Sequence, residues 1–232
     1  MKKFVKVALA AVMAVSVLGV SSTSVMAKKS NKEVITVGIS PDYKPYESLN
    51  KKNKMVGFDI DMVKWFGKYL SKEEGKKVTF QFKQMDFDNI VTQLQGDQVD
   101  LGISGFTYSE DRKVEWSEPY LGSSQVAVVP NGSDITSVDQ LEGKSLVAQT
   151  GATGEKAAKD VKDAQVTGLK NVQDIMNALS ANQYDAAVVD SGVAKQYAQS
   201  GQFTTLDGSL LDEKNYIIAK EGNKEMIDKV NK

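Results

Sequence analysis

The chain contains no cysteine and no histidine, and a single arginine stands among its 29 basic residues. Without cysteine it can form neither a disulfide nor a thiolate nucleophile, and without histidine it lacks the imidazole that many catalytic sites use. Metal sites built from Cys and His are excluded for the same reason. We predict no catalytic residue, no metal site and no cofactor.

Long apolar runs are also missing, with one exception near the N-terminus. Three lysines precede an almost uninterrupted apolar run, Val7–Val20, and small residues then lead to Ala27. This order is typical of a secretory signal peptide. The alternative is a membrane span, but at ~1.5 Å per residue the run is shorter than the ~30 Å core of a bilayer. We predict a signal peptide over residues 1–27, cleavage near Ala27, and a soluble product in the periplasm or at the cell surface.

Neither sign of charge dominates the predicted mature chain. Without the three N-terminal lysines, 26 basic residues face 30 acidic ones, so the net charge lies near −4. A nucleic-acid-binding domain usually carries a clear basic excess. The chain after position 27, about 205 residues, is enough for one large domain or two smaller ones. We expect a monomer that binds no nucleic acid.

The hydrophobic pattern alternates between strands and helices. Val34–Ile39 is rich in β-branched residues and predicts a strand, and Val78–Phe82 alternates like a second one. Between them, a helix begins near Gly57, and its apolar positions keep helical spacing. A further helix over Ile90–Leu94 leads to a short buried strand, Asp100–Ser104. This βαβ rhythm predicts an α/β fold in which helices cover mainly parallel sheets.

A short pattern recurs at an interval of 85 residues. Ile90, Leu94, Gln98 and Asp100 match Ile175, Leu179, Gln183 and Asp185. In both copies a helix runs through a polar turn into an apolar strand, and strand Ser145–Ala148 with its loop mirrors strand Val34–Ile39. Four matches can arise by chance, but the matching order of elements favours two similar α/β lobes.

Four strand ends are expected to meet in one place. Open α/β sheets bind ligands beyond the carboxyl ends of their strands. Here these ends supply the segments Ser40–Tyr46, Ser104–Arg112, Gln149–Gly154 and Asp190. If the two lobes face each other, all four segments converge on one cleft, and interfaces between domains are preferred places for small-ligand sites.

Arg112, the only arginine, follows one of these strand ends. Its planar guanidinium can meet a carboxylate with two parallel hydrogen bonds, which a lysine cannot copy. The alternative is an ordinary surface residue beside Glu110, Asp111 and Lys113. The position just after Ser104-Gly105 favours the carboxylate-binding role.

Asp190 is the natural complement of Arg112. It ends the apolar strand Ala186–Val189, where an unpaired carboxylate is costly to desolvate. One alternative is that it caps the helix from Ser191 onward. In the ligand hypothesis Asp190 holds an ammonium group, so that Arg112 and Asp190 in opposite lobes grip the two ends of a zwitterion.

Two weaker signals concern a loop and two aromatic residues. The loop Gln149–Gly154 leads into a helix at about Glu155, and its glycines permit a carboxylate to approach the helix N-terminus. It lacks the spacing of a phosphate-binding P-loop. Tyr43 and Phe87 lie in polar stretches at lobe edges and can flank a ligand side chain, although core packing or simple exposure is the alternative for each.

Several motifs together resemble one family. They are Val56-Gly57-Phe58-Asp59-Ile60-Asp61, Met85-Asp86-Phe87, Gly105-Phe106-Thr107, Glu110-Asp111-Arg112-Lys113, Trp116-Ser117-Glu118-Pro119-Tyr120 and Gln149-Thr150-Gly151. From about Val34 to its end, the chain is similar to the polar amino acid solute-binding proteins of ABC importers, family 3. The resemblance implies the type II periplasmic-binding fold, a two-lobed Venus flytrap. It also implies chain crossings near Gly122–Ala127 and Asp212–Tyr216, with residues 28–124 and 217–232 in lobe 1 and residues 125–216 in lobe 2.

The same resemblance implies roles for individual residues. Arg112 should clasp an α-carboxylate, helped by the amides of Thr107 and Thr153. Asp190, the Gly105 carbonyl and the Thr107 hydroxyl should receive the α-ammonium group. The remaining predicted contacts are Tyr43 and Phe87 beside the ligand side chain, and Ser104, Gln149, Ala152, Ser40 and Asp42 in the wall of the pocket.

Two features depart from the family pattern. Ser40 stands where several relatives carry an Asp that contacts the end of the ligand side chain, but Asp42 and Glu47 are nearby. These two acids favour a cationic or amide side chain, that of Lys, Arg or Gln. The chain also ends at Lys232, inside a predicted helix, where family members usually continue for another helix, so we expect a truncated C-terminus.

The sequence therefore predicts an extracytoplasmic protein that captures an L-amino acid and delivers it to the ABC transporter permease in the membrane. Two other classes of function stay open. An enzyme on the same fold, similar to cyclohexadienyl dehydratase, needs a cleft carboxyl with a raised pKa, and Asp42 and Glu47 are the nearest candidates. A surface adhesin or the binding module of a sensor is the other class, although no kinase, repeat or stalk segment supports it.

Overall fold

The computed structural model describes residues 31–232, which form one compact unit. The predicted signal peptide and its cleavage site lie outside the described residues. Within residues 31–232, no helix combines the length and the apolar character that crossing a membrane requires.

The described chain alternates between strands and helices, as the hydrophobic pattern predicts. The strands are β1 (Lys32–Ile39), β2 (Asp42–Tyr43), β3 (Glu47–Leu49), β4 (Met55–Val56), β5 (Lys77–Gln84), β6 (Leu101–Thr107), β7 (Val114–Trp116), β8 (Leu121–Pro130), β9 (Ser145–Gln149), β10 (Gln165–Leu169), β11 (Ala186–Asp190), β12 (Phe203–Thr205) and β13 (Leu211–Lys220). The helices are α1 (Phe58–Glu73), α2 (Ile90–Gln95), α3 (Thr153–Lys159), α4 (Val172–Ser180), α5 (Ser191–Ala198) and α6 (Lys224–Val230).

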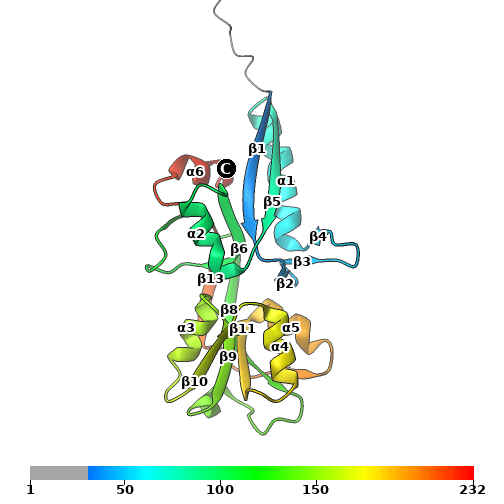
Figure 1. Ribbon diagram of the computed structural model, residues 1–232, viewed down its shortest axis with the longest axis vertical. Helices are drawn as coiled ribbons and strands as arrows, with labels where there is room; N and C mark the ends of the chain where they lie inside the picture. Colours follow the sequence, from blue (N-terminus) through cyan, green and yellow to red (C-terminus); the bar gives the residue numbers. More distant parts are fainter. Residues whose placement is uncertain (1–30) are drawn as a thin grey trace, which may run out of the picture. The chain divides into compact units, whose positions relative to one another are not determined.

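One sheet of ten strands runs through the molecule. Its path is β10-β9-β11-β8-β13-β6-β1-β5, with β12 paired to β8 and β7 paired to β13. At one end β1 pairs in parallel with β5 and β6, and at the other end β9 pairs in parallel with β10 and β11. In the middle β8 and β13 pair antiparallel, so the two parallel parts belong to a continuous sheet (Figure 1).

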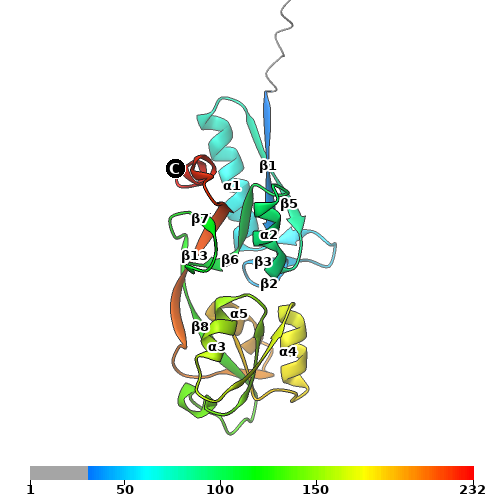
Figure 2. The ribbon, with the colours of Figure 1, turned by 60° about the vertical axis from the view of Figure 1, so that its left-hand side comes forward.

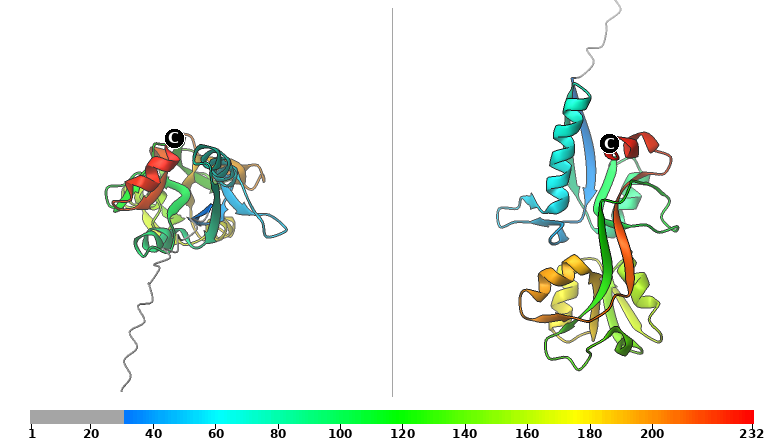
Figure 3. Two further views of the ribbon diagram at one scale, coloured as in Figure 1. Left: turned by 90° about the horizontal axis from the view of Figure 1, so that it is seen from above. Right: turned by 180° about the vertical axis from the view of Figure 1, so that it is seen from behind.

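The helices divide into two groups along this sheet. We call β1–β7 with α1, α2 and α6 the first lobe, and β9–β12 with α3, α4 and α5 the second lobe (Figure 2). The ten-residue strands β8 and β13 lie side by side and connect the lobes (Figure 3). Both crossings expected from the family resemblance, Gly122–Ala127 and Asp212–Tyr216, fall within these two strands.

The first helix shows how the pattern of apolar residues positions the site. Ile60, Val63 and Leu70 lie on one face of α1 and are buried. Val63 and Leu70 pack with Ile35 and Val78, which come from β1 and β5. Fully burying one such side chain contributes roughly 1.5–3 kcal/mol, so this face holds the helix against the sheet whose strand ends carry the site.

The repeated sequence pattern has a structural counterpart in each lobe. Asp100 Oδ2 accepts hydrogen bonds from the backbone N–H and the hydroxyl of Thr36, both at 2.7 Å. In the second lobe Asp185 Oδ2 accepts the same pair of bonds from Ser145, at 2.8 and 2.7 Å. In both lobes, therefore, the repeated aspartate ties the turn after a helix to the neighbouring parallel strand.

Candidate functional site

A small cavity of about 10 Å³ lies between the two lobes. The residues that line it are Tyr43, Phe87, Ser104, Gly105, Thr107, Arg112, Gln125, Gln149, Ala152 and Thr153. The structure therefore brings together residues from three of the four predicted strand-end segments. Most of the predicted site residues are among them, and the exceptions are Ser40, Asp42 and Asp190.

Arg112 is the cation of this cavity. It donates one hydrogen bond to the Thr107 carbonyl at 2.7 Å and another to the Gly151 carbonyl at 2.6 Å, so both lobes hold it. Its guanidinium carbon lies 5.6 Å from the centre of the Phe87 ring and 5.4 Å from that of Phe106, within cation–π range. It forms no ion pair with any residue of the described chain. The side chain is thus oriented but has no anionic partner.

Partial removal from solvent affects the pKa of Arg112. Desolvation lowers the pKa to about 10, and the negative charge of Glu213 acts in the opposite direction. The guanidinium therefore remains protonated at neutral pH. A planar charged group with unused N–H donors in a small cavity suits a carboxylate.

Tyr43 forms the opposite wall beside Gly105. The Tyr43 ring is buried and stacks on Tyr46 with a centroid distance of 5.7 Å. Gly105 has a φ of +60°, and a Cβ atom there would lie 3.1 Å from a carbon of the Tyr43 ring. Position 105 therefore needs glycine both for its left-handed backbone and for the close approach of the ring.

Thr107 and Asn215 carry buried polar atoms that lack a partner in the described part of the chain. These atoms are the Thr107 hydroxyl oxygen and the Asn215 side-chain oxygen. The Asn215 amide donates to the Gly105 carbonyl at 3.0 Å. Leaving a buried polar atom unpaired costs about 1–3 kcal/mol, so the Thr107 hydroxyl in the cavity wall is ready for a ligand.

Asp42 lies outside the cavity and joins the two lobes. Its Oδ2 accepts a bond from the backbone N–H of Val172 at 2.7 Å, at the start of α4, and a longer one from Gln149 at 3.4 Å. Its Oδ1 accepts from the Ser40 hydroxyl at 2.8 Å, and the Ser40 N–H donates to Ser104. Burial raises the pKa of Asp42. Asp42 and Ser40 therefore contact the lining residues Gln149 and Ser104 but do not line the cavity themselves.

Asp190 also lies outside the cavity lining, and its side chain is 1% exposed. Its Oδ1 accepts bonds from the Tyr46 hydroxyl and the Gly192 N–H, each at 2.8 Å, and the Ser123 hydroxyl donates to its Oδ2. The bond from Gly192 caps α5. The structure therefore shows the helix cap that the sequence left open, and the predicted bond from Asp190 to an ammonium group stays a prediction.

A pair of carboxyl groups lies beneath the cavity. Glu47 accepts a bond from the Ser104 hydroxyl at 2.6 Å, and Asp59 accepts one from the Tyr120 hydroxyl at 3.0 Å. Burial raises the pKa of both, and repulsion from Asp59 raises that of Glu47 further. Of these two carboxyl groups, we therefore expect Glu47 to be the one that carries a proton. Both residues are 0% exposed, so Glu47 offers no general acid to a substrate in the cavity.

Sequence reasoning missed two polar residues near the cavity, Gln125 and Glu213. Gln125 lines the cavity from β8, and its amide donates to Glu213 on β13 at 2.6 Å. Both positions fall in the expected crossings between lobes, for which the resemblance implies only a connecting role. Polar residues within those crossings were the signal that could have found them.

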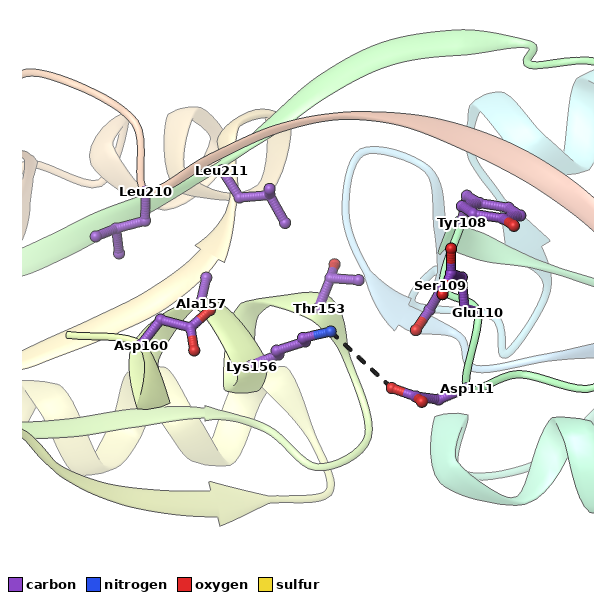
Figure 4. A pocket seen from close by; sticks show the side chains of 10 residues that line it. All are labelled: Tyr108, Ser109, Glu110, Asp111, Thr153, Lys156, Ala157, Asp160, Leu210 and Leu211. Atoms are coloured by element: carbon purple, nitrogen blue, oxygen red, sulfur yellow. Dashed lines mark ion pairs between the residues drawn. The ribbon is translucent and has the colours of Figure 1, made fainter.

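A larger pocket opens beside the cavity and shares Thr153 with it (Figure 4). Lys156 of α3 and Asp111 of the loop after β6 face each other across this pocket at 4.0 Å. Both side chains are mostly exposed, so this ion pair contributes little. Half-buried Arg112 and the unpartnered Thr107 hydroxyl make the smaller cavity the better candidate site.

Comparisons with known proteins show which proteins this chain is similar to. Residues 35–232 match the bacterial extracellular solute-binding proteins, family 3. The arginine-binding extracellular protein ArtP of Bacillus subtilis (strain 168) is 29% identical over 240 residues, covering 100% of this chain and 91% of that protein.

Two solved structures are also similar. The substrate-binding protein of an amino acid ABC transporter is 34% identical, with a TM-score of 0.78 over 86% of this chain and 90% of that one. An ancestral arginine-binding protein bound to arginine is 33% identical, with a TM-score of 0.75 over 85% and 88%. The fold is thus the two-lobed type II periplasmic-binding fold.

Proposed function

The chain belongs to the bacterial extracellular solute-binding proteins, family 3, and from this premise we propose that it captures a cationic L-amino acid between its lobes. The observation that carries the proposal is that Arg112 is held in the cavity without an anionic partner. Its guanidinium lines the cavity, donates hydrogen bonds to a carbonyl in each lobe, and forms no ion pair in residues 31–232. A partly desolvated charge without a counterion is costly, so a ligand carboxylate is its natural partner.

The α-carboxylate of the ligand would lie on the unused N–H donors of Arg112 and on the amides of Thr107 and Thr153. Tyr43 would flank the rest of the ligand. Phe87 would flank the ligand as well as support Arg112, because its ring lines the cavity and lies under the guanidinium. Asp190, the Gly105 carbonyl and the Thr107 hydroxyl remain the proposed receivers of the α-ammonium group.

The charges around the cavity favour a cationic side chain. Arg112 contributes one positive charge, whereas Asp42 and Glu213 each accept a bond from a lining residue. Asp190 accepts one from Tyr46, which stacks on the lining residue Tyr43. A ligand with an additional positive charge complements this excess of carboxylates. The names of ArtP and of the ancestral protein, both arginine-binding, point the same way. A glutamine side chain is the second choice.

Capture and delivery follow from contacts between the lobes. A ligand held by Arg112 and by second-lobe residues such as Gln149 favours the closed arrangement. The closed protein would then be recognised by the permease of an ABC importer, and the ligand would leave unchanged, without catalysis. The chain would carry out this role outside the cytoplasm after export.

Thermal unfolding against a panel of L-amino acids, their D-forms and simple amines tests the proposal. A ligand that binds only the native state raises the unfolding midpoint with concentration. We expect L-arginine or L-lysine to raise it most, D-arginine far less, and Arg112→Lys to abolish the shift. A cooperative transition that no amino acid moves would reject an amino acid ligand, and turnover of a panel member would favour an enzyme.

A further inference from the structure

A groove of about 600 Å³ lies between α1 and β5 in the first lobe, and it shares no lining residue with the cavity between the lobes. Its apolar lining consists of buried Val63 and Val78 and the half-buried rings of Phe80 and Phe82. The polar and small lining residues are Lys64, Gly67, Lys68, Ser71, Lys77 and Thr79. The groove is as large as many ligand sites, which occupy about 300–1,000 Å³.

Gly67 keeps the groove open on the side of the helix. It lies in the interior of α1, where glycine lowers stability relative to alanine. A Cβ atom at this position would lie 3.5 Å from a carbon of the Phe80 ring and 3.6 Å from the Val78 carbonyl oxygen, which is ordinary contact. Alanine would therefore fit at position 67, whereas a longer side chain would extend over Phe80 and fill the groove.

The strand β5 presents an open edge to this groove. Within residues 31–232 it ends the large sheet and pairs with β1 alone, and α1 lies alongside it (Figure 1). The N–H of Lys77 donates to the residue before β1, whereas the N–H of Val78 donates to the Ser71 hydroxyl of α1, on the other side. Backbone groups alternate in direction along a strand, so those of Phe80 and Phe82 also face away from β1.

Lysines surround the groove and decide which occupant suits it. Lys64, Lys68 and Lys77 line it and are exposed, and no carboxylate is among its lining residues. Lys68 and Lys77 form no ion pair in the described part of the chain, and Lys64 pairs with Asp61 of its own helix. This positive rim complements an acidic segment, whereas a second copy of the chain would bring the same lysines against it.

We propose that this groove binds an extended acidic segment of a partner protein, which adds a strand to the open edge of β5. The backbone groups of Phe80 and Phe82 would pair with the segment, its apolar side chains would enter the groove, and its carboxylates would meet Lys68 and Lys77. An added strand gains affinity from main-chain hydrogen bonds and specificity from pockets for alternate side chains. This interaction is independent of the amino acid site.

A capped hexapeptide that alternates glutamate and valine tests the proposal by isothermal titration. We expect one peptide to bind per chain, and the same peptide with lysine in place of glutamate to bind at least about tenfold more weakly. The double variant Lys68→Glu with Lys77→Glu should reverse this preference. Lys162→Glu with Lys195→Glu makes the same change of charge at exposed positions of the second lobe and should leave the preference unaltered.

Amide hydrogen exchange locates the bound peptide. If it adds a strand, the N–H groups of Phe80 and Phe82 exchange more slowly in the complex, whereas that of Gln81, which faces β1, does not change. Methylation of one alternate set of peptide nitrogens should weaken binding at least about tenfold, because it removes the donors that face β5. Methylation of the other set is the matched control and should leave the affinity unchanged.

Two variants at Gly67 test the groove itself. Gly67→Leu should fill it and abolish peptide binding. Gly67→Ala should raise the urea midpoint of unfolding and keep the peptide affinity within about twofold of wild type. If Gly67→Leu does not fold, as its unfolding curve without peptide would show, the lysine variants and the methylated peptides still decide the question.

Several results would overturn the proposal. These are no binding of the acidic peptide, equal binding of the acidic and basic peptides, and binding that leaves the exchange of Phe80 and Phe82 unchanged. A dimer of the chain that forms with concentration and protects the same two N–H groups would assign the edge of β5 to a second copy instead. None of these results bears on the capture of an amino acid, which is measured separately.

Discussion

At the scale of single residues, the site depends on groups that are held in place before any ligand arrives. Arg112 is fixed by two carbonyls and two aromatic rings, and the close contact between Gly105 and Tyr43 shapes the opposite wall. Side chains that are already ordered lose little conformational entropy when a ligand binds.

Gly105→Ala should weaken both stability and binding. Alanine at a φ of +60° is strained, and its Cβ would press on the Tyr43 ring from 3.1 Å. We expect a loss of about 1–3 kcal/mol in the free energy of unfolding, measured in urea. Gly132→Ala is the matched control, because Gly132 has a φ of +85° but nothing within 4 Å of a Cβ. An equal cost at both positions would contradict the role of the Tyr43 contact.

Glu47→Gln should change how stability depends on pH. The folded-state pKa of Glu47 is raised, so the folded chain keeps a proton that the unfolded chain releases above about pH 4.5. Wild type therefore loses stability as pH rises through this window, whereas glutamine, which cannot ionise, does not. We expect the variant to unfold roughly 2–4 °C higher than wild type at mildly alkaline pH.

Glu33→Gln provides a comparison of opposite sign. Bonds from Lys229 and Lys76 lower the pKa of Glu33 in the folded chain. The stability that Glu33 contributes is therefore present above about pH 4.5 and is lost as pH falls. Thermal unfolding across pH 4–8 distinguishes the two. A Glu47→Gln curve parallel to that of wild type would rule out the proton on Glu47.

At the scale of elements, the repeated helix–turn–strand unit explains why the two lobes resemble each other. Asp100 and Asp185 make the same two bonds to Thr36 and Ser145. Their surroundings differ, because Asp100 is half-buried and Asp185 is exposed. The same contact should therefore be worth more in the first lobe.

Asp100→Ala is expected to cost about 2 kcal/mol of stability and Asp185→Ala about 1 kcal/mol, because solvent screens the exposed carboxylate more strongly. Urea unfolding of the two variants measures the difference. Asp134→Ala changes an exposed loop aspartate and should cost almost nothing. A larger loss at Asp185 than at Asp100 would contradict the argument.

The order of elements and much of the cavity could be predicted from the sequence, because both follow local periodicity and strand ends. Gly96 ends α2 and Gly57 precedes α1, as the pattern indicates. The continuous sheet could not be predicted, because β8 and β13 pair residues almost a hundred positions apart. Glu213 was missed for this reason, since only that pairing brings its side chain to Gln125. Asp190 shows another limit of prediction from sequence, because a carboxylate at the end of a strand can either cap the next helix or bind a ligand.

At the scale of the whole molecule, the lobes meet through contacts that need no ligand. Asp42 accepts the first N–H of α4, Tyr46 reaches Asp190, and Lys170 lies 3.4 Å from Asp88. The Lys170 side chain is largely exposed, so this pair is weak. The bonds of Asp42 and Tyr46 are more buried, so we expect them to be the stronger ties between the lobes.

Asp42→Ala should open the ligand-free protein. We expect a larger radius of gyration in small-angle scattering without ligand, a return to the wild-type value at saturation, and roughly fivefold weaker binding. Asp61→Ala removes only an exposed pair with Lys64 inside α1 and serves as the control. Identical scattering of the empty Asp42→Ala and wild-type proteins would contradict a latch at this position.

The most direct test of the central claim is isothermal titration of wild type and Arg112→Lys with L-arginine and with agmatine, which lacks the α-carboxylate. If Arg112 holds that carboxylate, wild type binds one L-arginine per chain and agmatine at least about 100-fold more weakly, and Arg112→Lys loses most of this preference. Equal binding of the two ligands by wild type, or an unchanged preference in Arg112→Lys, would contradict the account.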